Sequence, residues 1–195
     1  MKMKNFISNK TLQPKSFAIK MNRGELRNPP WTSDSSVTGG FLFESTLHLI
    51  DMVRYLFGEV KTITAVGSKS VYKCVDNFSM IFEMENGVHG VFSSSAHASW
   101  IFPFERVEIY GEHASIFNDE MEKVHYTLSL SSPIISESYS TLPVEERWGY
   151  IIENRLFIDR ILKKPIPEKL YADQRDGYMN VKLIESIYDK IGLGK

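Results

Sequence analysis

Four polar residues interrupt an otherwise apolar stretch of the chain, and their types are those of acid–base chemistry. Glu44, His48, Asp51 and Tyr55 follow one another at spacings of four, three and four residues. At 100° per residue in an α-helix, the four side chains fall within about 60° of arc and form one stripe. A histidine can take or give a proton near neutral pH, and a nearby carboxylate can orient it. The stripe therefore predicts a site for proton transfer.

Two other interpretations of the stripe remain open from the spacing alone. Glu44 and His48 are four residues apart, so they could form an intrahelical pair that supports the helix by about 0.2–0.5 kcal/mol. A histidine and carboxylates one turn apart could also share a metal ion. We expect no metal, because the sequence assigns no further ligands to complete such a site.

The segments around the stripe predict strands and helices in a definite order. Residues 15–25 alternate apolar and polar side chains, as a half-buried strand does, and the proline- and glycine-containing segment 27–40 predicts a loop. A helix over 41–57 carries the stripe and ends at Gly58. Strands with hairpin signals follow at 60–72, 78–85, 88–96, 105–111, 114–119 and 123–130, and amphipathic helices are predicted at 146–164 and 172–192.

This order predicts the fold class. Strands joined by hairpins, with the helices segregated from them, are typical of an α+β fold. We expect a mainly antiparallel, mixed and open β-sheet with helices packed on one face. The opposite face would stay uncovered, and an open sheet face with apolar residues usually binds a partner. The sequence therefore favours a homo-oligomer formed through that face.

Composition narrows the class of protein. The chain has 195 residues, 43% of them hydrophobic, which suits one sizeable domain. Its net charge of −1 gives no basic field for nucleic acid, and no apolar run approaches the roughly 20 residues of a membrane span. The single cysteine, Cys74, excludes an internal disulfide framework. These features predict a cytoplasmic protein that binds neither nucleic acid nor membranes.

The stripe and its flanking segments resemble one known family. The sequence "GGFLFESTLHLIDMVRYLFGE" is similar to the signature helix of the Gfo/Idh/MocA oxidoreductases, the relatives of glucose-fructose oxidoreductase and inositol dehydrogenase. Further similar segments occur in the same order: "PKSFAIKMNRGE", "VKTITAVGSK", "FEMENGVHGVFSSS", "ERVEIYGEHASI" and "ENRLFIDRIL". The resemblance extends from about residue 12 onward, and it implies the dihydrodipicolinate-reductase-like C-terminal domain of that family.

What the resemblance implies is an NAD- or NADP-dependent oxidoreductase that acts on a sugar, cyclitol or related polyol. His48 would be the proton-transferring residue and Glu44 its orienting or substrate-binding partner. Asp51 would support them, and Arg23 and Trp31 lie in a segment that approaches the substrate in this family. Trp31 could stack on a sugar ring or anchor the loop to the core. Two positions depart from the family pattern: Glu44 replaces the usual Asp, and Thr46 replaces a common Gly.

The nucleotide has no binding motif in this sequence. No G-x-G-x-x-G is present, so NAD or NADP would bind to a separate Rossmann domain, and no cofactor is expected on this chain. We therefore interpret residues 1–14 as an N-terminal tail left from the interdomain connection. Residues 15–195 would form one substrate-binding and oligomerisation domain, inactive by itself. The alternative is a non-catalytic binding or oligomerisation module descended from such an enzyme.

Overall fold

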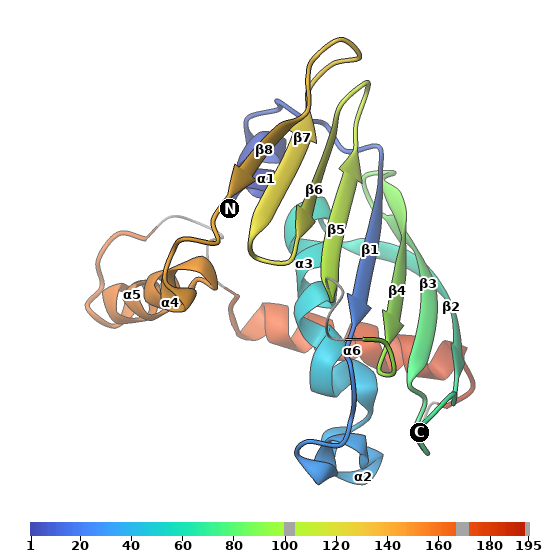
Figure 1. The fold of residues 1–195 in the computed structure, drawn as a ribbon. Helices are drawn as coiled ribbons and strands as arrows, with labels where there is room; N and C mark the ends of the chain where they lie inside the picture. The colour runs from blue at the N-terminus through green and yellow to red at the C-terminus, as the bar shows by residue number, and fades with distance from the viewer. Residues whose placement is uncertain (100–103, 167–171, 194–195) are drawn as a thin grey trace.

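The computed structural model describes residues 1–99, 104–166 and 172–193. Within these residues the chain forms one eight-stranded sheet in the order β2-β3-β4-β1-β5-β6-β7-β8 (Figure 1). The strands are β1 (Ser16–Asn22), β2 (Val60–Ser68), β3 (Asn77–Met84), β4 (His89–Ser95), β5 (Glu105–Tyr110), β6 (Ser115–Asp119), β7 (Lys123–Thr127) and β8 (Ile135–Ser138).

The sheet is mixed because β1 enters its centre. Strand β1 pairs in parallel with β4 and antiparallel with β5, while every other neighbouring pair is antiparallel. The predicted hairpin at Asn86-Gly87 joins β3 to β4. The expected α+β class with a mainly antiparallel, mixed sheet is confirmed.

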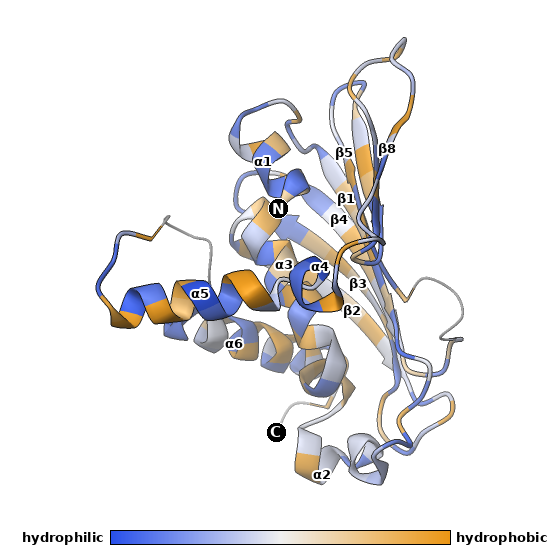
Figure 2. Ribbon diagram, turned by 60° about the vertical axis from the view of Figure 1, so that its left-hand side comes forward, coloured by the Kyte–Doolittle hydropathy of each residue, from blue (hydrophilic) through white to orange (hydrophobic). Residues whose placement is uncertain are grey.

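Helices cover one face of this sheet (Figure 2). Helix α3 (Leu47–Phe57), which follows a π-helical turn η2 (Leu42–Thr46), and helix α6 (Gln174–Lys190) lie on that face. The alternate residues of the strands point inward to meet them, so that Phe17 of β1 stacks on Phe57 of α3 with ring centroids 4.2 Å apart. Gly90 of β4 allows this approach, because a Cβ atom there would lie 2.4 Å from both the ring and the carbonyl oxygen of Phe17.

The other face of the sheet is open, as expected. Its side chains alternate with those of the core, and the register aligns Thr64, Ile81, Val91, Ala18 and Glu108 across five neighbouring strands. Ile81 and Val91 are 51% and 53% exposed. Apolar side chains in the middle of a sheet face that helices do not cover are typical of a contact surface.

The N-terminal segment is more ordered than a tail. Residues Lys2–Ser8 form helix α1, whose Met3, Phe6 and Ile7 pack against the core, and Leu12 is only 1% exposed. The short helix was missed because its apolar residues lie among lysines. Whether this segment descends from an interdomain connection stays a prediction.

Two further elements differ from the sequence-based expectation. Strand β8 was not predicted, and the helix predicted over 146–164 is divided into α4 (Val144–Arg147) and α5 (Tyr150–Ile161). Gly149 divides them because it adopts the left-handed conformation, with φ of 85°. The loop before the stripe also contains a 3₁₀ turn, η1 (Pro30–Ser33), and the short helix α2 (Ser35–Thr38). In the part of the chain described, no helix combines the length and the apolar character needed to cross a bilayer.

Candidate functional site

The stripe on α3 points away from the sheet. Leu49, Ile50 and Val53 face the strands and are at most 2% exposed. Since the stripe lies on the opposite side of the helix, His48 is exposed and Asp51 is partly exposed. The apolar composition of α3 therefore serves the core, and His48 and Asp51 lie on the outer surface of the helix layer.

The acidic end of the stripe is an ion pair with the strand that runs through the centre of the sheet. Arg23 directly follows β1, and its backbone N–H donates to the carbonyl oxygen of Ser95 at 2.7 Å. Its guanidinium Nη1 lies 2.7 and 2.9 Å from the two carboxylate oxygens of Glu44. It also donates to Oγ of Ser45 at 2.8 Å, and that hydroxyl bonds to Glu44 as well.

Burial makes this pair important. The side chain of Glu44 is 9% exposed and that of Arg23 is 20% exposed. A carboxylate so far removed from water needs a charged partner and hydrogen bonds. The π-helical turn η2 presents Glu44 and Ser45 together to one guanidinium, so the structure fixes the position of the carboxylate one turn before His48.

The spacing alone allowed a Glu44–His48 pair, and the structure gives Glu44 a different partner. In the described chain, the carboxylate pairs with Arg23, and His48 makes no hydrogen bond or ion pair with another described residue. No group of three or more His, Cys, Asp or Glu side chains among these residues could hold a metal ion. The imidazole is therefore open to an external molecule.

Asp51 links α3 to α6. Its carboxylate accepts a hydrogen bond from Nδ2 of Asn180 at 2.6 Å, and the Oδ1 atom of Asn180 accepts one from Arg54 at 2.9 Å. The guanidinium of Arg54 also binds Glu59 through two bonds of 2.8 and 3.1 Å and Asp176 at 3.3 Å. Hydrogen bonding to Glu59 raises the pKa of Arg54. Asp51 thus belongs to a network that holds the two helices together.

The sequence did not reveal most of this network. Asn180 lies far along the chain from Asp51, and its role depends on the packing of α6 against α3. Arg54 and Glu59 are five residues apart and straddle the helix end, which is no standard intrahelical spacing. Arg54 was the available signal for this network, because it adjoins the apolar face of the helix and a buried arginine requires acidic partners.

Two other residues from the sequence analysis lie apart from this cluster. Trp31 is in η1 and is 53% exposed, so its indole is available on the surface. Thr46 is completely buried, and its hydroxyl is 2.8 Å from that of Ser94 in β4. The departure from the family pattern at Thr46 is therefore accommodated between helix and sheet, away from the outer stripe.

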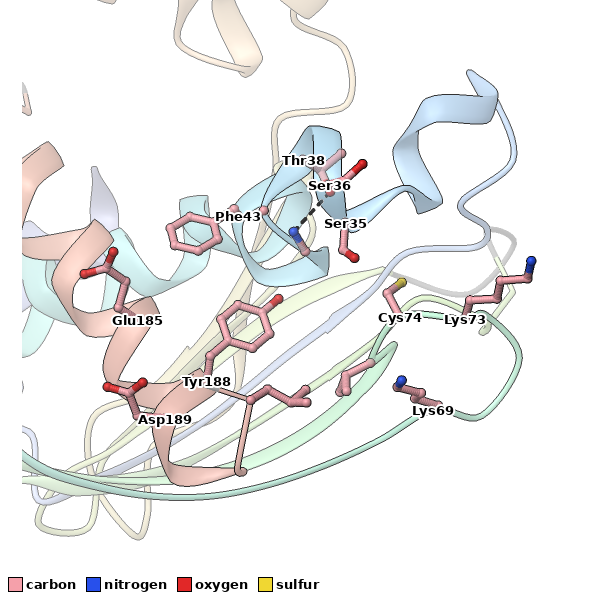
Figure 3. A pocket seen from close by; sticks show the side chains of 14 residues that line it. Ser35, Ser36, Thr38, Phe43, Lys69, Lys73, Cys74, Glu185, Tyr188 and Asp189 are labelled. Atoms are coloured by element: carbon pink, nitrogen blue, oxygen red, sulfur yellow. Dashed lines mark hydrogen bonds between the residues drawn. The ribbon is translucent and has the colours of Figure 1, made fainter. Parts of the chain in front are cut away.

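A cavity of about 860 Å³ lies on another side of the η2 turn (Figure 3). Phe43 and Tyr188 form an aromatic wall, with ring centroids 6.0 Å apart. Burial raises the pKa of Tyr188 to about 12, and its hydroxyl accepts a hydrogen bond from the backbone N–H of Leu42. Gly40 (φ 112°) is required there, because a Cβ atom would lie 2.3 Å from that hydroxyl. None of the five predicted site residues lines this cavity.

The sequence matches a known family of domains and one characterised relative. A family model described as the GFO/IDH/MocA C-terminal domain matches residues 2–117. The chain is 28% identical over 141 residues to myo-inositol 2-dehydrogenase of Thermotoga maritima, an alignment that covers 68% of this chain and 42% of that enzyme.

Solved structures show the same fold. Levoglucosan dehydrogenase in complex with NADH and L-sorbose superposes with a TM-score of 0.83 at 18% identity, covering 97% of this chain and 60% of that one. Aldose-aldose oxidoreductase of Caulobacter crescentus, complexed with glycerol, gives a TM-score of 0.76 at 15% identity, covering 99% and 58%. The chain thus spans under half of the inositol dehydrogenase and about three fifths of the solved relatives.

Proposed function

Because the chain belongs to the GFO/IDH/MocA family through its C-terminal domain, we propose that it supplies the substrate-binding wall of an NAD(P)-dependent oxidoreductase acting on a sugar, cyclitol or polyol. One observation carries this proposal: a carboxylate fixed by Arg23 lies one turn before an exposed histidine on the outer face of α3. A fixed hydrogen-bond acceptor beside a free imidazole suits a substrate with several hydroxyl groups.

In this proposal, the residues of the chain handle binding and proton transfer. Oxidation of an alcohol requires removal of the hydroxyl proton, and the imidazole of His48 would accept it. Glu44 would accept a hydrogen bond from a second hydroxyl of the substrate, and the bonds to Arg23 and Ser45 would keep it in place. Asp51 acts indirectly, because its contact with Asn180 fixes the position of the helix that carries His48.

The described residues do not fit a nicotinamide dinucleotide. They contain no glycine-rich turn between a strand and a helix, and the parallel pair β1 and β4 is separated along the chain by α3 and two antiparallel strands. The nucleotide, which supplies the hydride acceptor in such enzymes, would bind to another domain. The substrate class rests on the names of the relatives, which are dehydrogenases of inositol and levoglucosan and an aldose oxidoreductase.

The proposal includes self-association through the open sheet face and a cytoplasmic location. The exposed Ile81 and Val91 support the contact surface, because they lie centrally on the face that helices leave uncovered. Light scattering after size-exclusion chromatography should give more than one chain per particle. Ile81→Glu with Val91→Glu should yield monomers, and a wild-type monomer at all concentrations would contradict this part of the proposal.

An activity assay tests the proton-transfer role. The intact chain is joined behind the nucleotide-binding domain of the Thermotoga maritima inositol dehydrogenase, and NAD reduction is measured with myo-inositol and L-sorbose. His48→Gln should lower kcat by about 10²–10⁴-fold, the usual contribution of a general base. His89→Gln, an exposed histidine of β4, should leave kcat unchanged.

The outcomes separate the enzyme from the alternative, a non-catalytic module. Turnover that depends on His48 but not on His89 supports the enzyme. A folded fusion that binds NAD and turns over none of the sugars or polyols supports the module. Oxidation of sugars by the chain alone with added NAD would contradict the two-domain account.

A further inference from the structure

The cavity of about 860 Å³ beside the η2 turn has no part in the proposed function, yet its size suits a small molecule. Pockets that bind small molecules usually measure about 300–1,000 Å³. Its lining comes from segments 35–43, 69–75 and 185–193, which are the α2–η2 region, the β2–β3 loop and the end of α6 (Figure 3). Three segments that lie far apart in the sequence therefore enclose one space.

Two lysines of the β2–β3 loop form one end of this cavity. Neither Lys69 nor Lys73 makes an ion pair with another described residue. The loop is held by Asp76, which is completely buried and accepts bonds of 2.8, 2.6 and 2.8 Å from the backbone N–H groups of residues 70–72. Burial alone would raise the pKa of Asp76, but these bonds hold it below its ordinary value. The carboxylate is thus occupied by the backbone and leaves the two lysines unneutralised.

Neutral hydrogen-bond donors line the cavity beside the lysines. The hydroxyl of Ser35 has no hydrogen-bond partner among the residues that the structure describes. The hydroxyl of Tyr188 accepts from the N–H of Leu42, and because burial raises its pKa to about 12 it keeps a proton to donate. Burial also raises the pKa of the Cys74 thiol, although the charge of Lys69 opposes this shift. At neutral pH this end of the cavity offers donors and positive charge, which suits an anion.

The opposite end of the cavity is acidic. Glu185 and Asp189 of α6 lie on the far side of Tyr188 from the lysines (Figure 3). Within the described chain, neither carboxylate makes an ion pair, so both can accept hydrogen bonds from hydroxyl groups. The aromatic wall of Phe43 and Tyr188 offers a flat face on which a sugar ring can lie. A ligand that contacts both ends therefore carries an anionic group and several hydroxyls.

The arrangement of the donors favours a phosphate over a carboxylate as the anionic group. Lys69, Ser35 and Tyr188 come from three different elements, so their donors approach from separate directions. A phosphate monoester carries a charge of about −1.5 to −2 and three acceptor oxygens, whereas a carboxylate has two oxygens in one plane. Lysine binds phosphate as a point charge and needs no bidentate geometry. A free phosphate would leave the acidic end and the aromatic wall without a contact.

We propose that this cavity binds a phosphorylated sugar, with the phosphate at Lys69 and Ser35 and the sugar hydroxyls at Glu185 and Asp189. The ring lies against the aromatic wall. The cavity shares no residue with the stripe on α3, so this inference does not depend on the proposed function.

Isothermal titration calorimetry of the intact chain tests the site with two probes, D-glucose 6-phosphate and D-fructose 6-phosphate. At least one of them should bind saturably. Its affinity should exceed those of D-glucose and of inorganic phosphate by at least about tenfold, because each of these controls lacks one half of the contacts.

Substitutions at the two ends of the cavity make the test specific. Lys69→Met should weaken binding of the sugar phosphate at least about tenfold by removing the charged donor, and Ser35→Ala about two- to tenfold. Glu185→Gln should weaken binding of the sugar phosphate but not that of inorganic phosphate. Lys61→Met is the matched control, since this exposed lysine of β2 does not line the cavity, and it should leave the affinity unchanged. Because Lys69 is exposed, Lys69→Met should unfold at the wild-type temperature, so its loss of affinity reports on binding.

Amide NMR signals show where the ligand binds. The signals of Gly40 and Lys69 should shift with the same saturation as the heat signal, while those of the exposed Leu130 stay in place. The proposal is overturned if neither sugar phosphate binds saturably, or if Lys69→Met binds as tightly as wild type. Equal affinity for D-glucose or for inorganic phosphate would also overturn it, as would shifts around His48 with Gly40 and Lys69 unmoved.

Discussion

Replacing Arg23 by methionine removes the group that neutralises Glu44, and the structure predicts a substantial loss of stability. The methionine keeps the length of the apolar stem but removes the hydrogen bonds of 2.7 and 2.9 Å to the carboxylate and that of 2.8 Å to Ser45. The carboxylate, 9% exposed, would then remain without its charged partner.

The size of the expected stability loss follows from how deeply the pair of Arg23 and Glu44 is buried. Breaking a fully buried ion pair by removing one partner costs about 3–5 kcal/mol. Arg23 is 20% exposed, so water can partly replace it, and we expect a loss of about 2–3 kcal/mol in the free energy of unfolding. For a domain of this size, that loss corresponds to a fall of about 4–12 °C in Tm.

A double-mutant cycle in urea, followed by circular dichroism, measures this coupling. Arg23→Met with Glu44→Gln should be more stable than Arg23→Met alone, because the remaining amide carries no charge. Arg27→Met is the matched control, since Arg27 is exposed, and it should change stability by less than about 0.5 kcal/mol. Equal effects of Arg23→Met and Arg27→Met, or purely additive effects in the cycle, would refute the reasoning.

Three other substitutions probe the scaffold. Burial, with the nearby charge of Glu120 as a second cause, raises the pKa of Glu105 to about 7 from an ordinary 4.5. The folded chain therefore holds this proton at pH values where the unfolded chain has released it, so stability should fall by about 3 kcal/mol between pH 4.5 and 7. Glu105→Gln should flatten this part of the pH profile in urea titrations, and an unchanged slope would contradict the assignment. Gly90→Ala should cost more than about 3 kcal/mol, because the new methyl group meets both the ring and the backbone of Phe17, and a Tm within about 2 °C of wild type would show that the sheet can relax. Arg54→Met should cost about 1–2 kcal/mol, because Glu59 and Asp176 are 43% and 39% exposed and water can partly replace the guanidinium; exchange in α6 should rise before global unfolding, and unchanged α6 exchange would deny that the network ties the helices.

The sequence predicted the sheet and the stripe because their signals are local. The alternation in Phe17, Ile19 and Met21 marks the buried face of β1, and Asn86-Gly87 marks a hairpin. The spacing from Glu44 to Tyr55 placed the polar residues on one side of the helix predicted over 41–57. It did not show that this side faces outward, because periodicity gives relative and not absolute orientation.

The parts that were missed depend on contacts between distant segments. The pairing of Arg23 with Glu44 joins the end of β1 to the η2 turn, and no spacing rule connects them. The position of α1 depends on its packing against the core, and lysines obscure its short apolar pattern. Helix α5 has strong helical periodicity, from which we expected one buried face, but the described chain provides no surface to bury it.

The central claim is that the outer stripe of α3 binds a sugar or polyol, and NMR titration of the histidine ring signals tests it most directly. The labelled chain is titrated with myo-inositol and with L-sorbose, and His48 is identified by His48→Gln. We predict a saturable shift of the His48 signals that Glu44→Gln weakens, while the exposed His89 of β4 does not respond. His48 signals that do not move up to high concentrations of either compound would contradict the account.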